Sequence, residues 1–155
     1  MEYSRKNEQT NWIRWVCPFD RGLSGAISRL GRIDDVSRIL PALDVFVLVS
    51  DYEGLSNAIM EAQSFGIPVV VTDVGGNREI AVDGQTGFLV APGESGPFAD
   101  RVRSLLADPE RRSSMGAEAR RWISTEFSPE RMIRATASVY RELLTHSEEA
   151  SVATR

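Results

Sequence analysis

The sequence is poor in the residues that mark several classes of protein. Cys17 is the only cysteine, so no disulfide framework can hold the fold. His146 is the only histidine, and nothing in the sequence spells a metal site. No apolar run approaches the roughly 20 residues that a membrane helix needs. Residues 1–12 are mostly polar and do not resemble a signal peptide. We therefore expect a cytoplasmic protein without a transmembrane segment, either free or peripheral to a membrane.

The charge balance excludes another class of protein. The net charge is −4 and the isoelectric point is about 5.1. Lys6 is the only lysine, so arginines carry nearly all the positive charge. A nucleic-acid-binding domain typically has a basic face, and we expect no nucleic-acid partner here. The 155 residues suit one domain with a core of its own.

The middle of the chain alternates between helix and strand patterns. The continuous apolar runs at Asp44–Ser50 and Pro68–Val71 are typical of strands buried on both faces of a parallel sheet. A third strand is expected at Thr86–Ala91, and weaker strand patterns occur at Trp12–Cys17 and Ala26–Leu30. Helices are expected at residues 34–43, 56–65 and 78–82 between them. This alternation predicts a doubly wound α/β fold.

The last third of the chain is predicted to be helical. Helices are expected at Phe98–Ala107, from Pro109 to about Phe127, and from Ser128 to about His146. The last of them is expected to bury Met132, Ile133, Val139, Tyr140, Leu143 and Leu144. The predicted domain thus covers residues 12–146, between a flexible start at 1–11 and a flexible tail at 147–155.

The segment from Ser50 to Asn57 joins a predicted buried strand to a helix. In an open parallel sheet, ligands bind at the carboxyl ends of strands. The free N–H groups at the start of the helix favour an anion such as a phosphate. Gly54 lets the backbone approach a ligand closely, and Ser56 adds a hydroxyl. The segment therefore predicts a phosphate-binding turn.

Two glutamates flank this turn with seven residues between them. Glu53 precedes the helix and Glu61 lies inside it. A carboxylate only accepts hydrogen bonds, so a pair of adjacent hydroxyls is a suitable partner for each. The pair suits a ligand with phosphate in the middle and a sugar at each end. On spacing alone the plainer interpretation stays open, because glutamates at such positions are usually solvated surface residues.

Several segments in order resemble the C-terminal domain of retaining GT-B glycosyltransferases. The two glutamates resemble the E-x7-E motif of that group, a weak motif alone that becomes specific in its ordered context. The matching segments are Gly31–Val36, Asp44–Ser50, Glu53–Ala58, Glu61–Ala62, Gly66–Val70, Asp73–Glu79 and Asp83–Val90. The resemblance implies a truncated Rossmann-like, GT-B C-terminal sheet with flanking helices.

The resemblance also implies a donor substrate and a role for each site residue. The donor would be a UDP- or GDP-sugar, bound without a metal or other cofactor. Glu53 would contact the sugar hydroxyls and act in catalysis, and Glu61 would contact the ribose. Gly54, Leu55 and Ser56 would bind the distal phosphate and sugar, and Gly31, Arg32 and Ile33 would lie near the base. Gly75 and Gly76 are expected to form a tight turn.

Two parts of the family pattern are not found in the sequence. The acceptor-binding domain has no counterpart, and no strand with the usual basic diphosphate contact precedes residue 26. We therefore expect a donor-binding domain that needs an acceptor domain from elsewhere, or a homodimer joined through an open sheet edge. A non-catalytic nucleotide-sugar-binding module and an inactive remnant stay open as alternatives.

Overall fold

The computed structural model describes residues 25–28 and 30–152, with side chains as far as residue 144. The chain divides into two compact units, Met1–Asp34 and Asp35–Arg155. Every element named below belongs to the second unit. In chain order they are η2 (Val36–Arg38), η3 (Leu40–Ala42), β1 (Phe46–Leu48), α1 (Asn57–Ser64), β2 (Val69–Thr72), α2 (Asn77–Ile80), β3 (Gly87–Val90), α3 (Ser95–Ala107), α4 (Pro109–Glu126) and α5 (Pro129–Val152).

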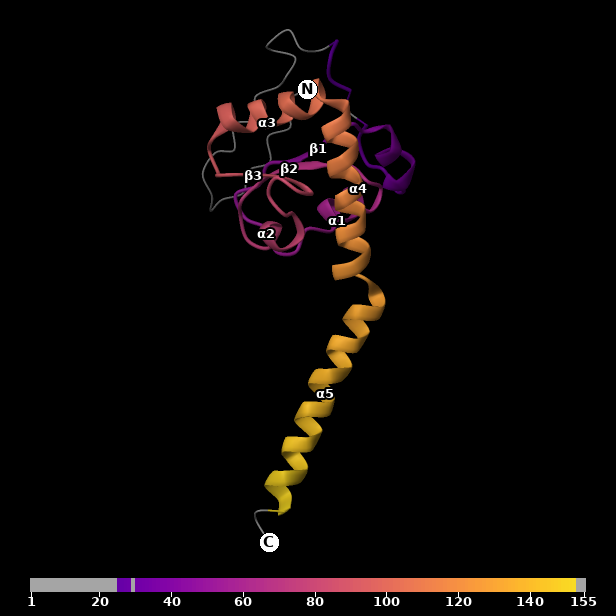
Figure 1. Ribbon diagram of the computed structural model, residues 1–155, viewed down its shortest axis with the longest axis vertical. Coiled ribbons are helices and arrows are strands. Elements are labelled where there is room, and N and C mark those ends of the chain that lie inside the picture. The colour runs from indigo at the N-terminus through magenta and orange to yellow at the C-terminus, as the bar shows by residue number, and fades with distance from the viewer. Residues whose placement is uncertain (1–24, 29, 153–155) are drawn as a thin grey trace. The chain divides into compact units, whose positions relative to one another are not determined.

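A parallel sheet of three strands organises the second unit (Figure 1). The strand order is β1-β2-β3, with Phe46 opposite Val69 and Val69 opposite Gly87. Helices α1 and α2 connect the strands, as parallel neighbours require. All the carboxyl ends of the strands therefore lie at one edge of the sheet. The prediction of a Rossmann-like parallel sheet with flanking helices and a helical C-terminal third is confirmed.

Helices cover both faces of the sheet. On one face Val69 and Val71 pack with Ile59 of α1 and Ile80 of α2. On the other face Val70 lies in a cluster with residues of β3, α3 and α4, namely Phe88, Val90, Leu105 and Met115. Alternate residues of β2 thus pack into two different cores, which explains why its apolar run is continuous. Val69, Val70 and Val71 are fully buried, as expected.

The prediction that Asp44–Ser50 is buried on both faces is wrong. The strand is shorter, and the side chains of Val47 and Val49 are 48% and 72% exposed. Among the described residues β1 pairs only with β2. An edge strand lacks the covering neighbours of a central one, so apolar sequence did not guarantee burial here.

The helix expected at residues 34–43 is instead two short 3-10 turns, η2 and η3. Asp35 caps the first turn, with its carboxylate accepting from the Ser37 amide at 3.1 Å. Pro41 lies in the second turn, and its ring removes a donor that a continuous α-helix would use. No continuous helix therefore reaches residue 43.

Helix α5 differs most from its prediction. It forms where expected, with Ser128 capping the Arg131 amide at 3.2 Å, but it runs to Val152, beyond His146. The prediction that its apolar residues are buried is wrong, because they are 56–65% exposed; they are Met132, Ile133, Val139, Tyr140, Leu143 and Leu144. The amphipathic pattern specified the helix, but α1, α3 and α4 already fill the two cores.

Other predictions lie at or beyond the limits of the described residues. The strand expected at Ala26–Leu30 is not formed by residues 26–28 and 30, and Leu30 is exposed. A strand needs a hydrogen-bonded neighbour, and the described sheet begins with β1. The strand expected at Trp12–Cys17 and the side chain of His146 lie outside the description. The domain boundaries at residues 12 and 146 stay predictions. No helix within the described residues is long and apolar enough to cross a membrane.

Candidate nucleotide-sugar site

The turn predicted to bind phosphate lies at the carboxyl end of β1. The chain leaves β1 at Leu48, passes through Glu53 and Gly54, and enters α1 at Asn57. Ser56 occupies the N-cap position and is buried, but its side chain makes no capping hydrogen bond. The first amides of an α-helix have no partner within the helix. The start of α1 therefore lacks a side-chain cap at the point where an anion could bind.

Glu53 is held in place by its neighbour in the turn. Its side chain is half-buried, and its Oε1 accepts a hydrogen bond from the Ser50 hydroxyl at 2.8 Å. Within the described residues, Oε2 has no such partner. One oxygen therefore anchors the carboxylate, and the other can accept hydrogen bonds from a ligand.

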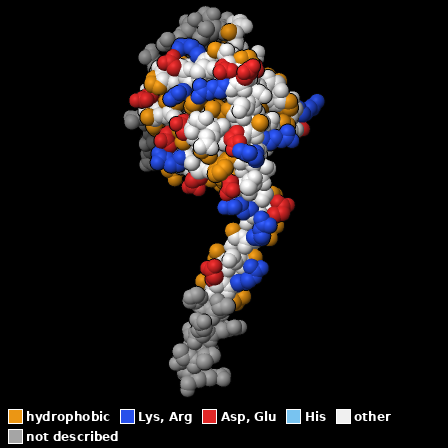
Figure 2. All heavy atoms as spheres, in the orientation of Figure 1, with side chains coloured by type: hydrophobic (Ala, Val, Ile, Leu, Met, Phe, Trp, Pro, Cys, Tyr) orange, Lys and Arg blue, Asp and Glu red, His pale blue; other side chains and the backbone are white. Residues whose placement is uncertain are grey.

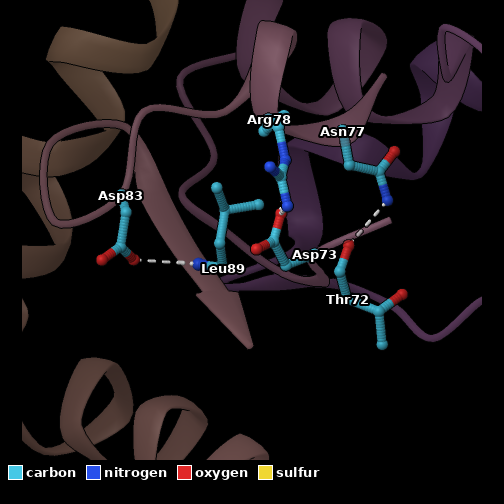
Figure 3. Close-up of polar contacts among 6 residues, drawn as sticks. All are labelled: Thr72, Asp73, Asn77, Arg78, Asp83 and Leu89. Atoms are coloured by element: carbon cyan, nitrogen blue, oxygen red, sulfur yellow. Dashed lines mark hydrogen bonds and ion pairs between the residues drawn. The ribbon is translucent and has the colours of Figure 1, made fainter. Parts of the chain in front are cut away.

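Ser50 is in turn fixed by the neighbouring strand. The Thr72 hydroxyl accepts from the Ser50 amide at 2.9 Å and donates to the Ser50 carbonyl at 2.8 Å. The Thr72 carbonyl accepts from the Asn77 side-chain amide at 2.9 Å (Figure 3). Thr72 and Asn77 are both buried. A chain of hydrogen bonds thus connects α2, β2 and the Glu53 carboxylate.

The loop from β2 to α2 is held by an ion pair and a backbone hydrogen bond of its own. Arg78 forms an ion pair with Asp73 at 2.9 Å across the loop (Figure 3). The backbone amide of Asn77 also donates to the Val74 carbonyl at 3.1 Å. This hydrogen bond closes the turn predicted around Gly75 and Gly76. In the next connection, between α2 and β3, Asp83 accepts from the amide of Leu89 within β3 at 2.9 Å (Figure 3). The loop is therefore ordered by its own contacts.

The remaining predicted donor residues of the second unit are solvent-accessible. Glu61 lies on α1 and is exposed, Leu55 is half exposed, and Gly54 is exposed. A Cβ atom added at Gly54 would meet nothing within 4 Å, so the space beside this backbone is open. The structure thus places Glu53, Gly54, Leu55 and Ser56 in one turn and Glu61 on the helix that follows.

The residues predicted to lie near the base belong to the first unit. Gly31 has a φ of +66°, a conformation that favours glycine. Arg32 pairs with Asp34 at 3.2 Å, and both side chains are almost fully exposed. Ile33 is half-buried. Each unit is described by itself, so the role of these three residues near a base stays a prediction.

A cavity of about 420 Å³ lies at the opposite edge of the sheet. It is lined by Gly84 and Gln85, which precede β3, and by one side of α4. Arg121 and Glu118 of α4 form an ion pair there, and the hydrogen bond and charge of Glu118 raise the pKa of Arg121. Because the strands are parallel, this cavity is at their amino ends and the Glu53 turn is at a carboxyl end. It is therefore separate from the candidate site.

Sequence reasoning missed the supporting part of the site. Ser50, Thr72 and Asn77 were not identified as functional, although each is polar and lies at the end of a strand or the start of a helix. A polar residue that follows a buried apolar run, such as Thr72 after Val71, is a usable signal, because buried polar groups must find partners. The pairing of Thr72 with Ser50 depends on the strand register, which the sequence does not specify.

The fold and the site together define a class of protein. A parallel sheet between helices, with an uncapped helix start and an anchored carboxylate at a strand's carboxyl end, is the arrangement of a Rossmann-like domain. The family model described as "Glycosyl transferases group 1" matches residues 20–122. The chain belongs to this family, and its relatives of known structure are GT-B glycosyltransferases.

Curated relatives match over most of this chain. The N-acetyl-alpha-D-glucosaminyl L-malate synthase of Bacillus anthracis is 30% identical over 123 residues, which is 79% of this chain and 32% of that protein. The alpha-maltose-1-phosphate synthase of Mycolicibacterium smegmatis is 36% identical over 114 residues, 70% of this chain and 30% of that protein. The chain thus spans about a third of the length of the relatives it matches.

Solved structures show the same fold. The sucrose-phosphate synthase of Thermosynechococcus elongatus matches with a TM-score of 0.76 and 27% identity, over 83% of this chain and 33% of that one. Anabaena HepE, solved in complex with UDP-glucose, matches with a TM-score of 0.75 and 26% identity, over 81% of this chain and 35% of that one.

Proposed function

We propose that this chain binds a nucleotide diphosphate sugar, a UDP- or GDP-sugar, as the donor side of a retaining glycosyltransferase. The observation that carries the proposal is the anchored carboxylate of Glu53 beside the uncapped start of α1, at the carboxyl end of β1. Membership of the glycosyl transferases group 1 family and the UDP-glucose complex of a structural relative support it.

The phosphates would bind at the start of α1. The first amides of a helix and its partial positive charge favour an anion. Gly54 leaves open space beside its backbone, so a diphosphate could approach closely. Leu55 and Ser56 would present their backbone amides in the same turn. The helix start supplies only about half a unit of positive charge, and the family resemblance implies that the donor binds without a metal.

The two glutamates would bind the two sugars of the donor. Glu53 has one carboxylate oxygen held by Ser50, and the other would accept from hydroxyls of the transferred sugar. Glu61, exposed on α1, would accept from the ribose hydroxyls. Gly31, Arg32 and Ile33 would lie beside the base.

The chemistry would need a second part that binds the acceptor. In retaining transfer, the bond from the anomeric carbon to the diphosphate oxygen breaks, and the acceptor oxygen bonds to that carbon on the same face. The leaving diphosphate takes the proton of the acceptor. This chain would hold the donor, and residues outside it would hold the acceptor, since the chain spans about a third of its relatives.

The exposed edge of β1 favours one alternative arrangement, a homodimer. Val47 and Val49 are exposed beside an edge that, within the described residues, has no strand partner. An apolar edge can pair with another chain, so two copies could meet there. A concentration-independent monomer in sedimentation experiments would exclude this arrangement and leave the acceptor-domain scheme standing.

Calorimetric titration tests the donor site. The chain is titrated with UDP, GDP, UDP-glucose and GDP-mannose, and the same ligands are added to Glu61→Ala. We expect weak binding of one base and a loss of about ten-fold or more in affinity on Glu61→Ala, since a hydrogen bond to a charged group contributes about 1.5–3 kcal/mol. Glu79→Ala is the matched control, because Glu79 is an exposed helical glutamate outside the site.

The outcomes separate the proposal from its alternatives. Binding that Glu61→Ala weakens and Glu79→Ala does not supports the donor site. Absence of heat with all four ligands, on folded protein, would contradict the proposal and favour an inactive remnant. Binding without transfer, even after an acceptor domain is supplied, would indicate a non-catalytic module.

A further inference from the structure

The loop between β2 and α2 touches the Glu53 turn along its backbone. The Gly76 amide donates to the Gly54 carbonyl at 3.2 Å, although the two residues belong to different connections of the sheet. A Cβ atom added at Gly75 would overlap the Glu53 carbonyl oxygen. One added at Gly76 would lie 2.5 Å from the Gly54 carbonyl oxygen, closer than real Cβ atoms come. Only glycine therefore allows the two loops to meet.

The two glycines differ in what they require. Gly75 has a φ of +48°, which disfavours other residues whatever their surroundings. Gly76 has φ −78° and ψ 1°, a conformation open to alanine. The backbone angles thus give no reason for glycine at position 76. The reason for glycine there is the close approach of the Glu53 turn.

The β2–α2 loop is held more firmly by its own contacts than the Glu53 turn that it touches. Asn77 is fully buried and bonded to the Thr72 carbonyl, and Arg78 closes the loop on Asp73 (Figure 3). Gly54 and Leu55 of the opposing turn are exposed. If the two loops were pushed apart, the Glu53 turn would therefore be the part that moves.

We propose that Gly75 and Gly76 are positioning residues that clamp the backbone of Glu53 and Gly54, and so set where the Glu53 carboxylate meets the donor sugar. The clamp acts on the backbone of Glu53 and Gly54, while the hydroxyl groups of Thr72 and Ser50 hold the same turn through hydrogen bonds. The proposal rests on the proposed function for the role of Glu53. It assigns the β2–α2 loop a part in sugar binding without direct contact to the sugar.

Gly76→Ala tests the clamp with few side effects. The added methyl group fits the backbone angles and conflicts only with the Glu53 turn. Gly96→Ala is the matched control, because Gly96 lies in α3 and an added Cβ there meets nothing within 4 Å. Amide hydrogen exchange of the ligand-free 155-residue chain is the first measurement. We expect faster exchange in residues 52–56 for Gly76→Ala and no change for Gly96→Ala.

Binding is the second measurement. The ratio of the affinities for UDP-glucose and UDP reports sugar contacts, with GDP-mannose and GDP used instead if guanine nucleotides bind better. We expect Gly76→Ala to lower this ratio by about ten-fold, the order of one lost contact. In a Glu53→Gln background the same substitution should change the ratio no further, because it acts through Glu53. A merely structural role would lower both affinities together in both backgrounds.

A further measurement tests the clamp if Gly76→Ala does not fold. Should Gly76→Ala prove unstable, hydrogen exchange of the wild-type chain replaces it: the Gly76 amide donates to the Gly54 carbonyl and should be protected, and an unprotected Gly76 amide would overturn the clamp. Unchanged exchange in residues 52–56 together with an unchanged ratio would overturn the clamp. If wild-type protein binds no nucleotide, the proposed function fails, and the exchange experiment still decides whether the two loops are clamped.

Discussion

Strand β2 is an apolar run and helix α5 carries an amphipathic set of apolar residues, but only the apolar residues of β2 are buried. Val69, Val70 and Val71 of β2 are fully buried between two helical layers. The apolar residues of α5, such as Leu143 and Leu144, are more than half exposed. Figure 2 shows hydrophobic side chains at the surface of this helix. The comparison shows that an apolar pattern predicts which element forms, whereas burial depends on whether other elements are present to cover it.

The two glutamates of the E-x7-E pattern also differ in how firmly the structure holds them. Glu53 lies in a turn tied to β2 by Ser50 and Thr72, and Glu61 is exposed on the surface of α1. A fixed carboxylate suits the part of a ligand whose geometry matters for a reaction. An exposed carboxylate suits recognition of a part of the ligand away from the reaction, such as the ribose.

The largest loss of stability is expected from a substitution in the buried core. Leu105 of α3 is fully buried in the second core, and Leu105→Ala should lower the free energy of unfolding by about 3 kcal/mol through lost burial and a cavity. Denaturant unfolding measures the loss. The neighbouring Leu106→Ala is the control, since Leu106 is 53% exposed on the same helix. Equal losses for the two variants would contradict the assignment of the core.

The smallest effect is expected in α5. Leu143→Ala removes an exposed apolar side chain, so the free energy of unfolding should stay within about 0.5 kcal/mol of wild type. The same denaturant series measures it. A loss of about 2 kcal/mol or more, the size typical of a core leucine, would show that α5 is covered in solution and would break the comparison.

Much of the fold could be predicted from the sequence. Val69–Val71 as a strand, Gly66 ending α1 with a φ of +76°, and Ser128 capping α5 follow from local patterns. The short η2 and η3 turns and the exposed Val47 were not predicted, because they depend on Pro41 and on the neighbours of β1.

The candidate site divides in the same way. The turn at Glu53–Ser56 and the helix carrying Glu61 were predicted from the motif and its place after a strand. The contacts of Thr72 with Ser50 and of Gly76 with Gly54 join residues about 22 positions apart, and they depend on strand register and loop path. No local pattern contains that information.

The most direct test of the donor site is a chemical-shift map of the isotopically labelled chain titrated with UDP and with GDP. We expect one of them to perturb the amides of Gly54, Leu55, Ser56 and Asn57 at the start of α1. Perturbation confined to Gly84, Gln85 and the adjoining side of α4 would place the ligand in the cavity at the opposite edge of the sheet. That result, or no perturbation by either nucleotide, would contradict a donor site at the Glu53 turn.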